Sequence, residues 1–238
     1  MKDRLDKQLV KLGLLKTRSQ AESYIKLGQV KVGGQAVSKP GFLVDDAAKI
    51  ELAAKQQYVS RAGLKLASVA EVLELDFSGQ TVLDVGSSTG GFTDYALRHG
   101  AAKVIAVDVG SEQLHPSLRG DPRVELHEKT DIRDFKTEAK IDIVVADVSF
   151  ISLRDILPAV ARLASRQTRI VVMVKPQFEA GHSNLKHKGV IKNDHMRRQI
   201  LKDFENWARQ GFVIINKADS KVAGAHGNQE RFYLLAKA

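Results

Sequence analysis

From about residue 60 onward, apolar runs alternate with segments of helical spacing, and this alternation constrains the fold more than any other feature. The runs that predict strands are Thr81–Val85, Lys103–Val109, Val124–His127, Ile141–Ala146, Arg169–Val174, Phe212–Asn216 and Phe232–Ala236. Helices are expected from Leu64 to Leu75 and at Phe92–His99, Ser152–Ala164 and Met196–Arg209. Helical crossovers make strands parallel, so the pattern predicts an α/β doubly wound sheet. Only a loop separates the last two runs, which predicts an antiparallel final strand.

The N-terminal quarter of the chain has a different pattern. Leucines at helical spacing predict a helix over Arg4–Leu15, and Ser19 with Glu22 has the form of a capping box that opens a second helix. Two short β runs meet at Gly33-Gly34, and a last strand is expected near Lys49–Leu52. A unit this small buries little apolar surface alone, which indicates an appended recognition module.

Basic charge is concentrated in the same segment. Residues 1–65 carry 13 Lys and Arg against 6 Asp and Glu, a net charge of +7, whereas the other 173 residues have a net charge of +2. A localised basic module favours a polyanionic partner, most often nucleic acid, and a solubilising surface is the alternative. The predicted RNA contacts are Arg4, Lys16, Arg18, Lys26, Lys31 and Arg61.

Composition excludes several classes of site. The chain has no cysteine, which excludes disulfides, thiolate metal sites and cysteine nucleophiles. No stretch reaches the ~18 to 20 apolar residues of a membrane-spanning helix and no secretory signal is evident, so we expect a cytoplasmic protein without a membrane partner. A monomer is the expected oligomeric state. No metal is predicted, because the spacing of a metal site is lacking at His182, His187 and His226.

The segment VLDVGSSTGGFTD, from Val82 to Asp94, joins an apolar strand to a Gly-rich turn. Open α/β sheets bind nucleotide-like ligands at such turns. The Gly-Lys-Ser/Thr of a phosphate-binding loop is missing, and the glycines do not have the G-x-G-x-x-G spacing of a dinucleotide site. These departures disfavour a nicotinamide-dependent dehydrogenase.

Three aspartates at successive strand ends indicate a different cofactor. Asp84 would repel a pyrophosphate but suits a ligand with an ammonium and a sulfonium, which indicates S-adenosylmethionine. Asp108 is placed to accept from ribose hydroxyls and Asp131 to meet the adenine amino edge; each alone could be a turn or cap residue. The predicted cofactor-binding residues are Asp84, Gly86, Ser87, Gly90, Gly91, Phe92, Asp108, Asp131 and Asp147.

Lys175 ends the apolar run of the fifth strand, and Asp147 follows the fourth. Both are expected to emerge at the cofactor edge of the sheet, where the topology makes them neighbours. A partly buried lysine needs such a charge partner, which favours this interpretation. A snorkelling surface lysine is the alternative. Ser149 and Phe150 come next and are candidates for the target pocket, although core packing is the favoured role of Phe150.

Five motifs resemble the ribose 2'-O-methyltransferases of the FtsJ/RrmJ type, namely SRAGLKL, LDVGSSTGGFTD, ADVSF, VMVKPQFEAG and GNQERFYLL. The resemblance implies a Lys-Asp-Lys-Glu tetrad around the target hydroxyl, which falls on Lys65, Asp147, Lys175 and Glu230. RLDKQL and TRSQAESYIKLGQVKVGG resemble the RNA-binding domain of small-subunit ribosomal protein four. In this order, and with KGVIKNDHMRRQI, the whole is similar to the TlyA family, often labelled haemolysin.

The resemblance implies a class I S-adenosylmethionine-dependent methyltransferase fold, Rossmann-like with a seven-stranded, mostly parallel sheet, behind a small α+β RNA-binding domain. It implies 2'-O-methylation of a cytidine in ribosomal RNA or a ribosomal subunit, and the short chain ends look like the members implied to act on large-subunit rRNA. Expected boundaries are 1–56 for the RNA-binding domain, 57–60 for a linker and 61–238 for the catalytic domain. The alternatives are an inactive RNA-binding assembly factor and a haemolysin.

Lys175 is the candidate general base. Lysine is protonated at neutral pH, so this role requires burial and the like charge of Lys65 to favour the neutral amine. Asp147 and Glu230 oppose that effect because they stabilise the cation. In the alternative role, a charged Lys175 orients the hydroxyl, and the proton leaves to water or to an acidic partner.

Overall fold

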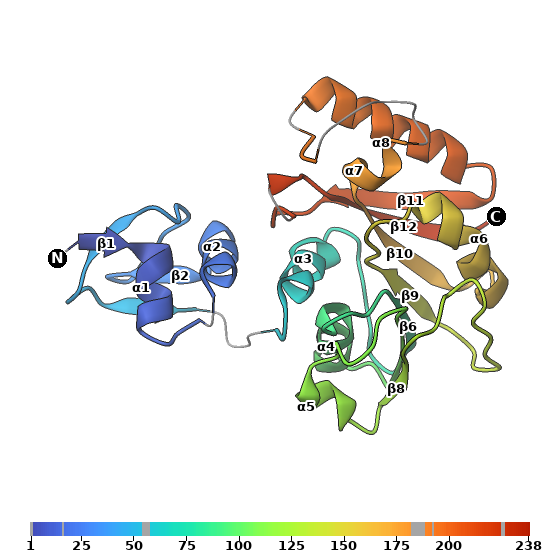
Figure 1. The fold of residues 1–238 in the computed structure, drawn as a ribbon, viewed down its shortest axis with the longest axis horizontal. Helices are drawn as coiled ribbons and strands as arrows, with labels where there is room; N and C mark the ends of the chain where they lie inside the picture. The colour runs from blue at the N-terminus through green and yellow to red at the C-terminus, as the bar shows by residue number, and fades with distance from the viewer. Residues whose placement is uncertain (1, 16, 54–57, 182–188, 192, 225–226) are drawn as a thin grey trace.

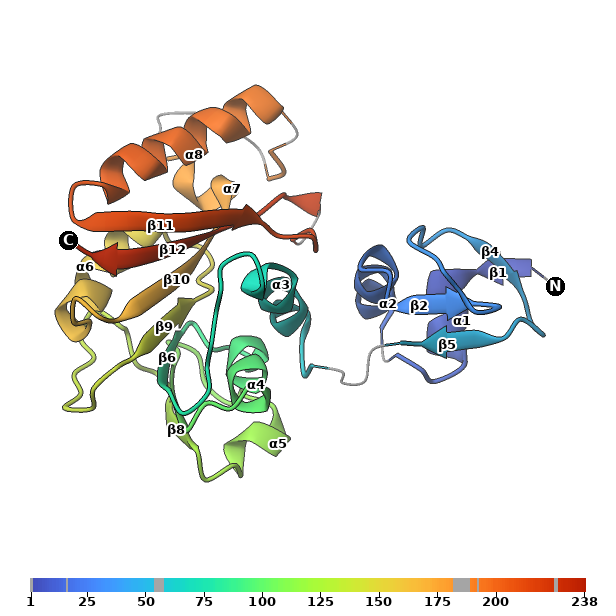
Figure 2. The ribbon, with the colours of Figure 1, turned by 180° about the vertical axis from the view of Figure 1, so that it is seen from behind.

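The computed structural model describes residues 2–15, 17–53, 58–181, 189–191, 193–224 and 227–238. Figure 1 shows a small part built from the N-terminal residues and a larger part from residue 58 onward. The two parts meet where α2 (Arg18–Lys26) lies next to α3 (Arg61–Ala70), as Figure 2 shows from behind. None of the described helices combines the length and apolar character needed to cross a lipid bilayer.

The small part packs two helices against short strands. Its elements are β1 (Lys2–Arg4), α1 (Leu5–Lys11), α2, β2 (Val30–Val32), β3 (Gln35–Ala36), β4 (Leu43–Asp45) and β5 (Ile50–Leu52). β2 pairs with β3 and β5, and β1 pairs with β4, all antiparallel. Leu5, Leu9 and Tyr24 are fully buried in its core. Leu64 and Val222 of the larger part join the same core, so the two parts share apolar contacts.

The beginning of the chain differs from the prediction. The first helix ends at Lys11, because Gly13 beyond it takes a left-handed conformation with φ +69°. The expected capping box is wrong: Thr17 rather than Ser19 caps α2, and its hydroxyl accepts from the Gln20 N–H at 3.2 Å. Strands β1 and β4 were not predicted, because three residues carry too little periodic signal.

Seven strands form the sheet of the larger part, in the order β11-β12-β10-β9-β6-β7-β8. Their bounds are β6 (Thr81–Val85), β7 (Lys103–Val107), β8 (Val124–His127), β9 (Ile143–Ala146), β10 (Arg169–Val174), β11 (Phe212–Asp219) and β12 (Arg231–Lys237). β12 is antiparallel to both neighbours and the other pairs are parallel. The predicted mostly parallel sheet and the direction of its last strand are confirmed.

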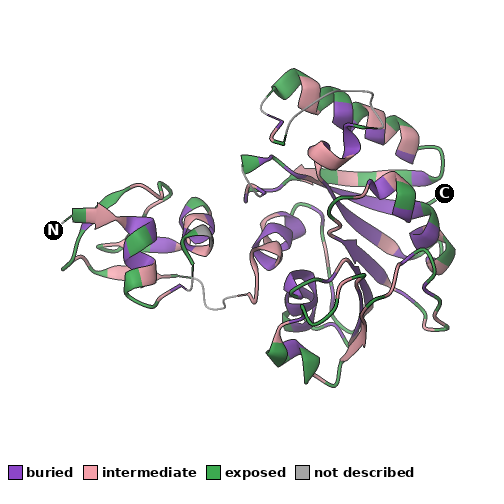
Figure 3. Ribbon diagram, in the orientation of Figure 1, coloured by how far each residue is buried: buried purple, intermediate pink, exposed green. Residues whose placement is uncertain are grey.

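Helices cover both faces of this sheet, whose central strands are mainly buried in Figure 3. They are α3, α4 (Gly91–Arg98), α5 (Pro116–Arg119), α6 (Leu153–Leu163), α7 (Pro176–Glu179) and α8 (Asp194–Ala208). Residues of α3, α4 and α5 belong to the core on one face, and residues of α6 and α8 to the core on the other. Two apolar layers around one sheet are the architecture that the alternating pattern predicted.

Strand β10 explains the apolar run before Lys175. Its even-numbered residues pack in the core with α6 and α8, whereas Val171 and Met173 pack in the core with α3 and α4. A strand covered on both faces has apolar residues at every position. Lys175 follows where the strand leaves these two cores.

Candidate active site

Parallel strands bring Lys175 and Asp147 to one edge of the sheet, because Lys175 follows β10 and Asp147 follows the neighbouring β9. The Lys175 Nζ and the Asp147 Oδ1 lie 2.5 Å apart, with 10% and 16% of the two side chains exposed. The same Nζ donates to the Ser149 Oγ at 2.8 Å. The expected strand-end neighbours therefore form a largely buried ion pair.

A second buried ion pair lies beside the first. Lys65 on α3 and Glu230, directly before β12, approach to 2.6 Å with 10% and 2% of their side chains exposed. β12 pairs with β10, so the residue before β12 lies near the residue after β10. Burial raises the pKa of Glu230, against the opposing charge of Lys65. Asp147 and Lys175 also act on this carboxyl, so the four side chains form one electrostatic cluster.

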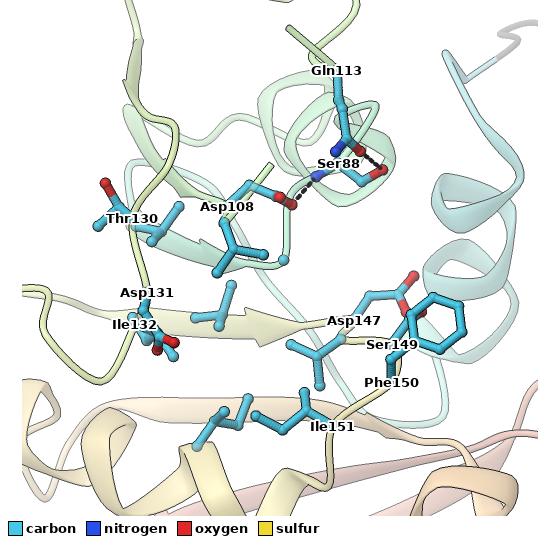
Figure 4. A pocket seen from close by; sticks show the side chains of 16 residues that line it. Ser88, Asp108, Gln113, Thr130, Asp131, Ile132, Asp147, Ser149, Phe150 and Ile151 are labelled. Carbon is cyan, nitrogen blue, oxygen red and sulfur yellow. Dashed lines mark hydrogen bonds between the residues drawn. The ribbon is translucent and has the colours of Figure 1, made fainter. Parts of the chain in front are cut away.

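A cavity of about 340 Å³ opens at the carboxyl ends of β6, β7 and β9, and Asp147 lines it. Asp108, after β7, also lines it and accepts from the backbone N–H groups of Ser88 at 2.8 Å and Gly110 at 2.7 Å. In Figure 4 Asp131 and Asp147 lie on opposite sides of this space. The cavity is thus lined by three aspartates from three strand ends.

Asp84 and Gly86 make the cavity suitable for a cationic ligand. Asp84 is buried and does not itself line the cavity, but it directly precedes Val85 and Gly86, which do. One of its oxygens accepts from the Thr93 Oγ1 at 2.6 Å, and the other has no hydrogen-bond partner among the described residues. Burial raises the pKa of Asp84 to about 7. At Gly86, with φ +78°, a Cβ would lie 2.9 Å from the carbonyl oxygen of Asp147. An orphaned buried carboxylate oxygen beside a glycine-lined space fits the ammonium and sulfonium of S-adenosylmethionine.

Comparison with known proteins identifies the family. The model of the FtsJ-like methyltransferases matches residues 58–237. The chain belongs to the FtsJ-like methyltransferase family. A model of the S4 domain matches residues 3–50, so both expected resemblances are confirmed.

Two relatives of this FtsJ-like chain carry the name TlyA, and a similar solved structure is named a hemolysin. A 16S/23S rRNA (cytidine-2'-O)-methyltransferase TlyA from Mycobacterium tuberculosis is 40% identical over 98% of this chain and 89% of its own length. A 23S rRNA (cytidine-2'-O)-methyltransferase TlyA from Campylobacter jejuni is 41% identical over 85% of this chain and 80% of its own. A solved structure from Streptococcus thermophilus, provisionally named a hemolysin, is 38% identical with a TM-score of 0.73 over 100% of this chain and 89% of that one. The expected similarity to the TlyA family is confirmed.

Besides Asp84, four predicted cofactor contacts lie outside the wall of the FtsJ-like cavity. Phe92 is buried in the core, with its ring centre 6.0 Å from that of Phe232. Gly91 packs against α3, and Gly90, with φ +88°, leaves no space for a Cβ. Ser87 is buried, and its Oγ has no hydrogen-bond partner among the described residues. Packing accounts for the two glycines, and the cofactor contacts of all four residues stay predictions.

Asp131 does line the cavity and is held by its own loop. The Arg133 guanidinium donates to it at 2.6 and 3.0 Å, which lowers the pKa of Asp131. Sequence reasoning missed Ser88, Gln113 and Thr130 on the same wall. Ser88 stands in the Gly-rich turn, which is a usable signal, whereas the other two lie in loops without periodicity.

Phe150 does not pack in the core, so the favoured expectation for it is wrong. It is 92% exposed and has a left-handed backbone with φ +66°. Its ring centre lies 5.3 Å from that of Phe178, and it lines the mouth of the cavity. The turn after β9 directs this ring outward, and the identity of the residue alone does not encode that direction.

Two of the predicted RNA contacts share one buried carboxylate. Arg4 donates to both oxygens of Asp6 at 3.0 and 2.9 Å, and Arg18 donates to Asp6 at 3.0 Å. The side chain of Asp6 has no exposed surface, whereas 43% of Arg4 and 52% of Arg18 is exposed. Asp6 therefore holds two cations at the surface of the S4 part.

The remaining predicted contacts are spread over the chain. Lys26 and Lys31 are exposed, and the Arg61 guanidinium donates to the carbonyl oxygen of Ala223 at 2.6 Å. Within the described residues, no group of three His, Cys, Asp or Glu side chains could hold a metal ion. Some residues considered above lie outside the described part of the chain, namely Lys16, His182, His187 and His226.

Proposed function

We propose that this methyltransferase transfers a methyl group from S-adenosylmethionine to the 2'-hydroxyl of a cytidine ribose in ribosomal RNA, with large-subunit rRNA as the substrate. The observation that carries the proposal is the cluster of two buried ion pairs, Lys65–Glu230 and Lys175–Asp147, beside the cavity. Buried charges are costly for folding, so their concentration at a ligand-sized cavity argues for a chemical task there.

The cofactor would occupy the cavity at the strand ends. S-adenosylmethionine supplies a methyl group that the sulfonium charge has already activated. The unpaired oxygen of Asp84 would receive its ammonium. Asp108 keeps lone pairs beyond its two backbone hydrogen bonds and would accept from the ribose hydroxyls. Asp131, fixed by Arg133, would accept from the adenine amino group.

Lys175 would orient the target hydroxyl. Its Nζ lies 2.5 Å from the Asp147 Oδ1 and donates to the Ser149 Oγ, so the side chain is fixed in position. We therefore assign Lys175 the role of a hydrogen-bond donor to the hydroxyl oxygen, and the proton leaves to water or to a carboxylate of the cluster. Alignment of reacting groups contributes about 7 to 11 kcal/mol in well-oriented reactions, so an orienting role is sufficient for a large effect.

Phe150 would receive the base of the target nucleotide. Its ring is exposed at the mouth of the cavity and leans on the ring of Phe178. Sequence-specific RNA recognition commonly stacks an unpaired base on an aromatic side chain. A target nucleotide stacked here would bring its ribose toward Lys175, whose Nζ lies 6.0 Å from the Phe178 ring centre.

The N-terminal part would grip the RNA. It matches the S4 domain, and its surface presents the two arginines that Asp6 holds. Cations fixed at a surface bind the phosphates of nucleic acids. Both named relatives carry 23S in their names, which supports large-subunit rRNA as the common substrate.

The test is a map of ribose methylation in rRNA from cells with and without this protein. We expect one 2'-O-methylcytidine of large-subunit rRNA to disappear without the protein and to return with the wild-type chain. The Asp147→Asn variant should not restore it, because the Lys175 ammonium loses its charge partner. Unchanged methylation in the deletion strain would contradict the proposed activity. Normal growth with the variant, but not without the protein, would indicate an assembly factor instead.

A further inference from the structure

The carboxylate of Glu179 is buried next to the proposed active site. Glu179 ends α7, the short helix that begins directly after Lys175, and only 1% of the residue is exposed. Its Oε2 accepts a hydrogen bond from the Ser152 Oγ at 2.7 Å, and its Oε1 accepts one from the Leu153 N–H at 2.7 Å. Both donors lie at the N-terminus of α6. Glu179 thus joins two segments that are separate in sequence.

Helix α6 has a second cap besides this carboxylate. Ser152 is its N-cap, since the Ser152 Oγ accepts from the Arg154 N–H at 3.0 Å. The Arg154 Nε also lies 3.5 Å from the Glu179 carboxylate. A buried carboxylate is costly unless its oxygens are bonded, and here the bonds lead from the segment after β10 to the segment after β9. The position of Glu179 therefore points to a link between these segments.

The two segments, residues 147–152 and 175–179, contact each other along their length. They are joined by three sets of contacts, which are, in the order of the second segment, Lys175 with Asp147 and Ser149, Phe178 with Phe150, and Glu179 with Ser152 and Leu153. The first set contains the proposed catalytic ion pair, and the second forms the aromatic surface at the cavity mouth. Figure 4 shows Asp147, Ser149 and Phe150 gathered on one side of the cavity.

The backbone of Phe150, in the aromatic contact, is strained. Phe150 has φ +66° while 92% of it is exposed, so few packing contacts hold its backbone. A bulky residue keeps a left-handed conformation only where its surroundings fix it. The fixed points on either side of Phe150 are Asp147, paired with Lys175, and the start of α6, bonded to Glu179.

We propose that Glu179 is a positioning residue that sets the distance between segments 147–152 and 175–179 and thereby aligns Lys175 and Phe150 on the target nucleotide. The inference rests on the function proposed above. Glu179 acts through Lys175 and Phe150, because the two residues that it binds, Ser152 and Leu153, do not line the cavity. Its loss should therefore lower the rate of the reaction more than the binding of either substrate.

The experiment compares Glu179→Ala and Glu179→Gln with the wild type in steady-state methylation of rRNA, with kcat and KM determined separately. We expect kcat of the alanine variant to fall by about tenfold to a hundredfold, because small misplacements of reacting groups have effects of this size. The KM for RNA and the dissociation constant for S-adenosylmethionine should stay within about twofold, since the binding surfaces remain. Glutamine keeps an acceptor for the Leu153 N–H, so that variant should recover most of kcat.

Leu201→Ala is the matched control for a loss of stability. Leu201 lies on α8, is 2% exposed, and belongs to the same core as Leu153. It should lower the melting temperature without lowering kcat at a temperature where the chain is folded. Equal kcat losses in Leu201→Ala and Glu179→Ala, or a glutamine variant as slow as the alanine variant, would overturn the positioning role. Wild-type protein that methylates no rRNA would overturn the proposed function itself, so the two failures are distinguishable.

Discussion

Asp6 in the S4 part and Glu230 in the methyltransferase part are both buried, but their pKa values are shifted in opposite directions. The Asp6 side chain in the S4 part has no exposed surface, and 2% of the Glu230 side chain in the methyltransferase part is exposed. Burial alone raises the pKa of a carboxyl group. At Asp6, hydrogen bonds from Arg4 and Arg18 outweigh burial and lower the pKa to about 2. At Glu230 the pKa remains raised by burial, although Lys65 opposes it.

The two pKa shifts differ in direction because the cationic partners of Asp6 and Glu230 differ in their exposure to solvent. Arg4 and Arg18 are about half exposed, so Asp6 is the buried member of a group whose cations remain solvated. Lys65 is only 10% exposed, so both members of the second pair lose hydration. The S4 part thus uses a buried charge to fix its surface, whereas the methyltransferase part keeps incompletely compensated charges beside a cavity. Incomplete compensation is typical of sites that move protons.

Replacement of Lys175 tests the proposed catalytic cluster of the methyltransferase part and has the largest expected effect, which is on kcat. Lys175→Met should lower kcat by at least about a hundredfold, because it removes the donor that we propose orients the hydroxyl. Cofactor binding should persist, since Lys175 does not line the cavity. Single-turnover transfer from labelled S-adenosylmethionine measures the effect. Lys175→Arg keeps the charge and should retain part of the turnover; an arginine variant as inactive as the methionine variant would favour the general-base role instead.

Replacement of Asp6 tests the structural side. Asp6→Asn should destabilise the protein by about 2 kcal/mol at neutral pH, because charge-assisted hydrogen bonds of a buried carboxylate are lost. A lowered folded-state pKa gives stability that is present above the ordinary value of 3.8 and is lost as the pH falls toward about 2. The difference in unfolding free energy between wild type and variant should therefore be smaller at about pH 2 than at neutral pH. Urea unfolding at these two pH values measures it.

The matched control is Asp46→Asn, at an exposed aspartate of the same S4 part that pairs with Lys11. It should change stability little, because exposed ion pairs are weak. RNA affinity should fall in Asp6→Asn and not in the control, since Asp6 accepts hydrogen bonds from Arg4 and Arg18 whereas Asp46 pairs with Lys11. Equal destabilisation by the two variants would contradict the contrast between buried and exposed carboxylates.

The sequence predicts the sheet better than the site, for a physical reason. The apolar run ending at Val174 requires a strand buried on both faces, and this also fixes where Lys175 and Asp147 emerge. The pairing of Lys65 with Glu230 joins a helix to the last strand, so only the family resemblance indicated it. Turn conformation placed Phe150 outside the core, and no periodicity encodes a turn of this kind. Glu179 stayed unnoticed because a glutamate in a short helix usually faces solvent.

Replacement of Asp84 has the smallest expected effect, and it tests whether this buried carboxylate binds the cofactor. Its pKa of about 7 means that protonated and charged forms coexist near neutral pH without a ligand. An ammonium binds only the charged form, so affinity for S-adenosylmethionine should rise roughly tenfold from about pH 5.5 to about pH 7. The cofactor ammonium stays protonated over this range, because α-amino groups titrate near about 7.7 to 8.0.

Stability should change in the opposite direction over the same range. A raised folded-state pKa means that the protonated carboxyl stabilises the fold below the ordinary value of 3.8, and this contribution is lost as the pH rises through about 7. The ligand-free protein should therefore become less stable while it gains affinity. Calorimetric titration in two buffers of different protonation enthalpy would detect the protons released on binding. Asp84→Asn should bind weakly without this pH dependence, and a wild-type affinity that stays constant would show that the ammonium has another partner.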